Sequence, residues 1–145
     1  MPPVRVLIAD DHQLFAETLA LTLALDDRIE VVGAAPNGKE AVRLAREVEP
    51  DAVLMDLEMP VVDSYEATRV LRRELPSCPV VVLTASLSPE DAHRARTAGA
   101  AAYLTKGCAT EHVIGALLEV AAAPAPEPQA KRSLLQFDAL SPHCV

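Results

Sequence analysis

Five short apolar runs, rich in β-branched residues, recur along the chain at intervals of roughly 25 residues. They begin at Val4, Ile29, Ala52, Pro79 and Ala101 and read VRVLIA, IEVVGAA, AVLMDL, PVVVLTA and AAYLTK. The middle runs are too continuously apolar for strands with one exposed face. We therefore expect five strands in a sheet that is covered on both sides.

Segments with helical periodicity and recognisable ends separate these runs. The expected start signals are Asn37, Asp63 with Glu66 three residues later, Ser88 with Pro89, and Thr110, and the expected stop is Gly99. A strand and a helix thus alternate five times, which predicts a mostly parallel sheet with helices on both faces. In open sheets of this kind ligands bind beyond the carboxyl ends of the strands, where the strand order reverses.

Polar residues stand at four of the five predicted strand ends. Asp10 and Asp11 follow the first run, Asp56 lies near the end of the third, Thr84 ends the fourth and Lys106 follows the fifth. The second run ends in plain GAA, which fits an edge strand away from the site. We expect three carboxylates, a hydroxyl and an ammonium group to meet at one rim of the sheet.

This set of groups indicates phosphoryl chemistry. Three neighbouring carboxylates repel one another, and a hard divalent cation such as Mg²⁺ resolves the repulsion. Lys106 adds a second positive charge, and Asp56, alone on the central strand, is the predicted nucleophile that forms an acyl phosphate. Any one aspartate after a strand is more often a turn former or helix cap. The coincidence at successive strand ends favours a site.

The segments LIADDH, VLMDLEMP, VVVLTA and AAYLTKG together resemble the receiver domain of two-component response regulators. The subtype resembles regulators with a LuxR/NarL-type helix-turn-helix output domain. The resemblance implies a (βα)5 doubly wound α/β fold with the flavodoxin-like strand order 2-1-3-4-5. It also implies phosphoryl transfer from a sensor histidine kinase, with Mg²⁺ as cofactor, in transcription regulation.

The resemblance assigns roles to individual residues. Asp56 is the phosphoacceptor, and the expected Mg²⁺ ligands are Asp10, Asp11, Asp56 and the backbone carbonyl of Glu58. Thr84 and Lys106 are expected to contact the phosphoryl group, Thr84 and Tyr103 to form a conformational switch, and Glu58 and Ser86 to tune the phosphate lifetime.

Three residues allow other interpretations. Tyr103 is alternatively a half-buried strand residue without a switching role. Ser64 stands where members of the family commonly have glycine. His12 is interpreted as a surface residue that caps or lines the first helix, in preference to a phosphate carrier or a metal ligand.

The net charge of −8 argues against direct DNA binding, which needs clustered Lys and Arg. No apolar run approaches the roughly 20 residues that span a bilayer, and no signal peptide opens the chain. We expect a cytoplasmic protein without membrane contact.

The first predicted helix has two apolar stripes, one of which contains Leu14, Leu21 and Leu25. The last helix is similarly apolar. One stripe must face the sheet, so the other is either additional core or an interface. A homodimer through these two helices is the resulting hypothesis.

Residues 1–122 are predicted to form the receiver, and residues 123–145 a linker and tail. The segment APAPEPQAKR reads as an extended linker, and ALSP is similar to the opening of a LuxR-type DNA-binding domain. The hypothesis is a regulator truncated or frameshifted after its receiver, and an unrelated native tail is the alternative.

Two other functions remain open. A stand-alone receiver acts through protein contacts or as a phosphate sink. A phosphohydrolase of the aspartyl-phosphate type usually has D-x-D after its first strand and a substrate cap, whereas this chain has adjacent aspartates and little spare length. The primary prediction is therefore a signalling phosphoacceptor, not an enzyme.

Overall fold

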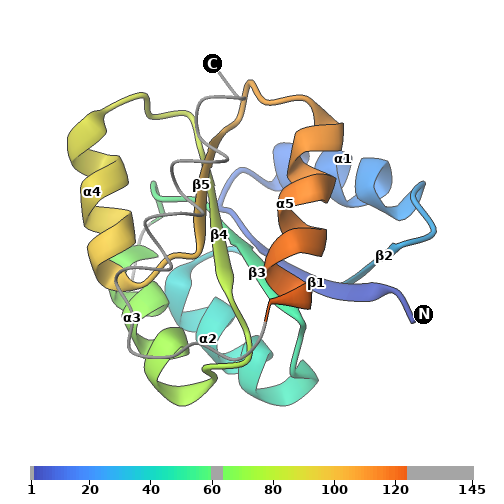
Figure 1. Cartoon of the computed structure of the whole chain (residues 1–145), viewed down its shortest axis with the longest axis horizontal. Helices are drawn as coiled ribbons and strands as arrows, with labels where there is room; N and C mark the ends of the chain where they lie inside the picture. Colours follow the sequence, from blue (N-terminus) through green and yellow to red (C-terminus); the bar gives the residue numbers. More distant parts are fainter. Residues whose placement is uncertain (1, 60–63, 124–145) are drawn as a thin grey trace.

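Five parallel strands form one sheet in the order β2-β1-β3-β4-β5 (Figure 1). The computed structural model describes residues 2–59 and 64–123. The strands are β1 (Val4–Ala9), β2 (Ile29–Ala35), β3 (Ala52–Met55), β4 (Val80–Thr84) and β5 (Ala102–Thr105). The predicted (βα)5 fold and its flavodoxin-like strand order are confirmed. Residues 124–145, which carry most of the predicted tail, lie outside the described residues.

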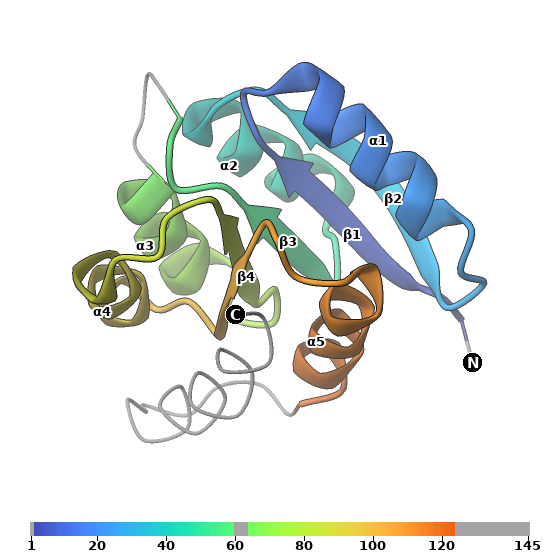
Figure 2. The ribbon, with the colours of Figure 1, turned by 90° about the horizontal axis from the view of Figure 1, so that it is seen from above.

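Helices cover both faces of the sheet (Figure 2). They are α1 (Gln13–Ala24), α2 (Gly38–Val48), α3 (Ser64–Glu74), α4 (Pro89–Ala98) and α5 (Thr110–Ala122). Helices α1 and α5 pack on one face, and α2, α3 and α4 pack on the other. Successive residues of a strand point to opposite faces. Leu7 therefore belongs to the hydrophobic core under α2, α3 and α4, and Val6 and Ile8 belong to the core under α1 and α5.

The helix ends follow local sequence signals. The Asn37 side chain accepts a hydrogen bond from the Glu40 backbone N–H, and the Ser88 hydroxyl accepts from the first turn of α4. Gly99 ends α4 with φ of 109°, a left-handed conformation that favours glycine. These three predicted caps are confirmed. Asp63 lies outside the described residues, so its predicted cap stays a prediction.

Helix α1 turns one stripe of leucines toward the sheet and another toward solvent. Leu19 and Leu23 are buried, whereas Leu14, Leu21 and Leu25 are 78%, 72% and 85% exposed. The second stripe is therefore surface and not additional core. Among the residues that the structure describes, no helix is long and apolar enough to cross a membrane.

The strand order reverses between β1 and β3. The chain leaves β1 toward α1 on one face and leaves β3 toward α3 on the other (Figure 2). The connections therefore diverge at the carboxyl ends of the two strands, which is where ligands bind in sheets of this type.

Candidate functional site

Backbone hydrogen bonds hold three of the predicted site residues at one edge of the sheet. The Asp10 N–H donates to the Ala35 carbonyl at 2.9 Å, and the Asp56 N–H donates to the Ala9 carbonyl at 2.9 Å. The Lys106 N–H donates to the Thr84 carbonyl at 2.7 Å. The hydrogen bonds of the sheet therefore continue one residue beyond the ends of β1, β3 and β5. They fix the backbone positions from which these three side chains extend.

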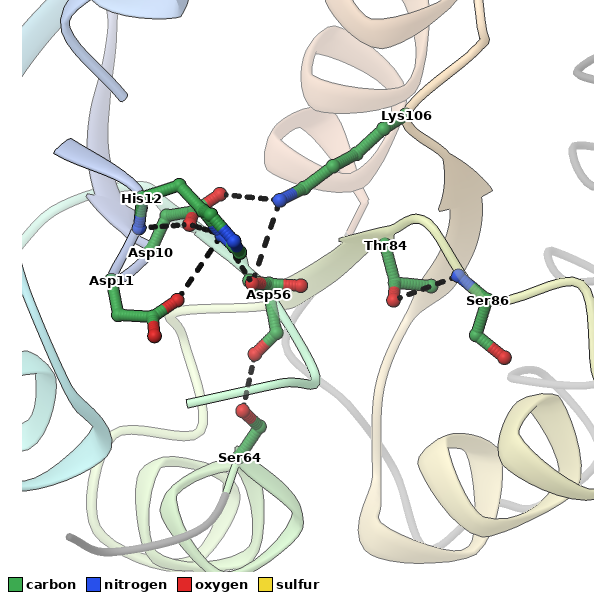
Figure 3. Close-up of polar contacts among 8 residues, drawn as sticks. All are labelled: Asp10, Asp11, His12, Asp56, Ser64, Thr84, Ser86 and Lys106. Carbon is green, nitrogen blue, oxygen red and sulfur yellow. Dashed lines mark hydrogen bonds and ion pairs between the residues drawn. The ribbon is translucent and has the colours of Figure 1, made fainter. Parts of the chain in front are cut away.

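The Lys106 ammonium group lies between two buried carboxylates (Figure 3). Its Nζ is 2.9 Å from Asp10 Oδ2 and 3.5 Å from Asp56 Oδ2. Asp10 and Asp56 are only 5% and 3% exposed. Nζ also lies 4.4 Å from the centroid of the Phe15 ring, so α1 forms one wall of the site. The predicted convergence of Asp10, Asp56 and Lys106 is confirmed.

Burial and neighbouring charge shift the pKa values of this cluster. Burial, followed by the negative charge of Asp10, raises the pKa of the Asp56 carboxyl; Lys106 and the Glu58 backbone act in the opposite direction. Burial opposes protonation of Lys106, but its hydrogen bond to Asp10 and the charges of Asp56 and Asp10 outweigh burial and raise its pKa. Asp56 thus sits where another positive charge would be favourable.

The oxygen donors present fit a divalent cation. Asp10, Asp11, His12 and Asp56 each offer one ligand atom, and these four atoms lie within 4.8 Å of one another. Asp56 Oδ2 is buried and has no hydrogen-bond partner. A buried carboxylate oxygen without a donor is unfavourable unless a cation contacts it. The Glu58 backbone favours the charged form of the Asp56 carboxyl and so acts to lower its pKa, while the role of the Glu58 carbonyl stays a prediction.

His12 belongs to this cluster, which the sequence interpretation did not expect. It is exposed and stands at the start of α1, as predicted, but its side chain forms no capping hydrogen bond. Its Nδ1 lies 3.1 Å from Asp10 Oδ1 and 3.2 Å from Asp11 Oδ1. Its position directly after two aspartates is a sequence signal for this contact.

Ser64 supports the site from α3, and the sequence analysis considered it only as a departure from glycine. Its buried hydroxyl donates a hydrogen bond to the backbone carbonyl of Asp56 (Figure 3). The Ser64 carbonyl in turn accepts a bond of 2.7 Å from the Thr68 hydroxyl. The serine therefore links the first turn of α3 to the end of β3.

Thr84 and Tyr103 meet at the segment that follows β4. The buried Thr84 hydroxyl accepts a bond of 3.2 Å from the Ser86 N–H. The Tyr103 hydroxyl donates to the Ser86 carbonyl at 3.1 Å, and Tyr103 is 5% exposed, more deeply buried than its alternative interpretation supposed. Ser86 also donates to Asp91 Oδ2 at 2.5 Å, and Asp91 Oδ1 accepts from Tyr65 at 3.2 Å.

One protein-family model and several known proteins match most of this chain. The family model of the response regulator receiver domain matches residues 6–118. Response regulator GacA of Pseudomonas aeruginosa is 41% identical over 117 residues, which are 81% of this chain and 55% of that protein. Transcriptional regulatory protein LiaR of Bacillus subtilis is 43% identical over 103 residues, 71% of this chain and 49% of that protein.

Solved structures show the same architecture. The signal receiver domain of NarL from Mycobacterium tuberculosis superposes with a TM-score of 0.81 at 31% identity, covering 86% of this chain and 100% of that one. A two-component response regulator of the LuxR family from Aurantimonas superposes with a TM-score of 0.78 at 29% identity, covering 92% of this chain and 96% of that one. The chain spans about half the length of the curated relatives it matches.

Proposed function

The chain belongs to the family of response regulator receiver domains of two-component systems, and from this premise we propose that it accepts a phosphoryl group on Asp56 from the histidine of a sensor kinase. The observation that carries the proposal is the buried Asp56 Oδ2, which has no hydrogen-bond partner and lies 3.5 Å from Lys106 Nζ. An anionic oxygen in that position is available to a phosphorus atom that arrives at the carboxyl ends of β1 and β3.

The step is a displacement at phosphorus. A carboxylate oxygen of Asp56 forms a bond to phosphorus while the bond to the donor's imidazole nitrogen breaks. The electron pair leaves with that nitrogen, which then takes up a proton. Lys106 lies close enough to Asp56 to contact the oxygens on which negative charge develops.

Receiver domains bind Mg²⁺ at an acidic site, and this chain has an aspartate cluster there. In the proposal Asp10, Asp11, Asp56 and the Glu58 carbonyl hold the ion. When bound, Mg²⁺ supplies positive charge that reduces repulsion between these carboxylates and the incoming phosphoryl group.

Thr84 and Tyr103 form the proposed switch. The Thr84 hydroxyl accepts a hydrogen bond from the Ser86 N–H, and the Tyr103 hydroxyl donates one to the Ser86 carbonyl. A phosphoryl group on Asp56 would compete for the Thr84 hydroxyl and so change the segment to which Tyr103 is bound. The side chains of Glu58 and Ser86 are proposed to tune the phosphate lifetime.

The role is that of a signalling phosphoacceptor that catalyses only its own phosphorylation and dephosphorylation. The related regulators GacA and LiaR span about twice the matched length, so the kinase partner, a cytoplasmic location and the ancestral link to transcription are part of the proposal. The prediction that residues 123–145 begin a lost output domain stays a prediction. Reading the downstream nucleotides in all frames for a helix-turn-helix tests it.

A homodimer through α1 and α5 completes the proposal. The two helices contact each other on the same face of the sheet, and α1 with its C-cap exposes Leu14, Leu21 and Leu25. A second copy would bury this stripe.

The test is incubation with Mg²⁺ and acetyl phosphate, followed by intact mass spectrometry. We expect the mass of one phosphoryl group to be added to the wild type and to Asp27→Asn, which changes an exposed aspartate, but not to Asp56→Asn. Failure of the wild type to gain mass with any divalent ion would refute the proposal. Continuous release of inorganic phosphate without a phosphoprotein would favour the phosphohydrolase.

A further inference from the structure

We propose that His12 is a direct metal ligand through Nδ1, which makes the site more favourable for ions that bind imidazole, such as Mn²⁺, than a site of carboxylates alone. The inference deepens the proposed function and rests on it, because it concerns the metal site that serves Asp56. It assigns to His12 a part in metal selectivity.

The first observation is the direction of the His12 ring. His12 occupies the N-cap position of α1, where a side chain commonly accepts a hydrogen bond from the first turn, yet it forms no such bond. Its backbone N–H donates instead to Asp10 Oδ1 at 2.8 Å. The ring lies over the carboxylates, with Nδ1 in hydrogen-bond contact with the same Asp10 Oδ1 at 3.1 Å (Figure 3).

The second observation is the spacing of the donor atoms. His12 Nδ1 lies 3.1 Å from Asp10 Oδ1, 3.2 Å from Asp11 Oδ1 and 3.8 Å from Asp56 Oδ2. A six-coordinate ion with bonds of about 2.1 Å separates neighbouring donors by about 3 Å and opposite donors by about 4 Å. The nitrogen therefore already stands at the distances that shared coordination requires.

The third observation is independent of His12. Asp56 Oδ2 has no hydrogen-bond partner, and its side chain is 2% exposed. This oxygen belongs to the same cluster, where one ammonium group, that of Lys106 at 3.5 Å, faces three carboxylates. The cluster therefore keeps an excess of negative charge and is not merely a group of solvated acids. The His12 side chain is 61% exposed, which leaves the site open to water and to a phosphoryl donor.

The chemical consequence follows from ligand preference. Mg²⁺ strongly favours oxygen ligands and retains several waters, whereas first-row transition ions also bind imidazole nitrogen. Mn²⁺ gains the least of these ions from an imidazole ligand, but it gains more than Mg²⁺ does. Replacing one water by His12 Nδ1 therefore increases affinity for Mn²⁺ more than for Mg²⁺. Lys106 stays outside the ligand set because its ammonium group has no lone pair.

The experiment measures Mn²⁺ on the full chain by electron paramagnetic resonance. The unbound ion gives the dissociation constant, competition gives that of Mg²⁺, and pulsed spectra report nitrogen coupled to the bound Mn²⁺. His12→Gln keeps an oxygen donor but removes the imidazole. His93→Gln, which changes an exposed histidine of α4, is the matched control.

We expect nitrogen coupling in the wild type and in His93→Gln, and its loss in His12→Gln. We also expect His12→Gln to weaken Mn²⁺ binding by about fivefold or more and to change Mg²⁺ binding much less. Equal Mn²⁺ affinity without His12-dependent coupling would overturn the inference and leave the proposed function standing. Tighter binding of both ions in His12→Gln would also overturn it, because the ring would then exclude the ion. If the wild type bound neither ion, the proposed metal site would fail as well.

Discussion

The carboxylate of Asp56 is held in a place that disfavours its own charge when no metal is bound. Burial and the charge of Asp10 raise its pKa above the ordinary value of 3.8. A raised pKa in the folded state means that the protonated carboxyl is favoured there. The stability that the protonated Asp56 carboxyl contributes is fully present below its ordinary pKa of 3.8, and it is lost as the pH rises through the folded-state pKa. The site is thus destabilising at neutral pH and gains from a bound cation.

Asp56→Asn is therefore expected to stabilise the metal-free protein at neutral pH. The free energy of unfolding should rise, and the gain should shrink as the pH falls toward the ordinary carboxyl pKa of 3.8. Thermal melts in chelator across this pH range measure it. Asp27→Asn, on the exposed surface, controls for the loss of one charge. A variant no more stable than the wild type at neutral pH would contradict the argument.

At the scale of elements, the start of α4 is joined to α3 and to the end of β4 through Asp91. Its carboxylate accepts bonds from Ser86 in the segment after β4 and from Tyr65 of α3. Burial, followed by the charge of Asp91, raises the pKa of Tyr65 to about 12. The same segment binds Tyr103, so Asp91 holds the part of the fold in which the proposed switch operates.

Removal of Asp91 should be visible in the titration of the tyrosines. The chain has two tyrosines and no tryptophan, so tyrosinate absorbance is easily resolved. In Asp91→Ala we expect the pKa of Tyr65 to fall from about 12 while staying above 10, because burial remains. We also expect a loss of about 1 to 2 kcal/mol in the free energy of unfolding at neutral pH.

Matched variants separate the causes. Asp91→Asn removes the charge but keeps one carbonyl oxygen, which can accept from only one of the two hydroxyl groups. Tyr65→Phe identifies which tyrosine responds. The stability linked to Tyr65 is fully present below its unfolded pKa of 10 and is lost as the pH rises toward about 12. An unchanged Tyr65 titration in Asp91→Ala would show that the two groups are not coupled.

Helix ends and strand ends were predictable for the same reason: their causes are local. Asn37, Ser88 and Gly99 act within a few residues of where they stand, and the rule that places ligands at strand ends predicted that Asp10, Asp56 and Lys106 would meet, as they do. The bond from Ser64 to Asp56 and the network around Asp91 join different elements. Sequence periodicity contains no information on such bonds, because they depend on the final packing of helices on the sheet.

At the scale of the whole molecule, a net charge of −8 opposes association while an apolar stripe favours it. Leu14 and Leu21 lie within one stripe of α1, and the C-cap residue Leu25 continues it, since positions seven and eleven residues apart nearly superpose around a helix. Self-repulsion between two acidic copies weakens with added salt. A dimer through this stripe should therefore be weak at low ionic strength and stronger at higher ionic strength.

Leu21→Lys should leave the fold intact and abolish this dimer, because the side chain is 72% exposed and a charge would be buried in the interface. Leu87→Lys is the matched control: Leu87 is 74% exposed but lies in the segment between β4 and α4, outside both α1 and α5. Sedimentation velocity with and without Mg²⁺ and acetyl phosphate, at two salt concentrations, measures the association. We expect dimer in the wild type and in Leu87→Lys, and monomer in Leu21→Lys. If the wild type stays monomeric in both phosphorylation states, the exposed leucines do not join two copies, and the stripe would then have to serve contact with a different protein.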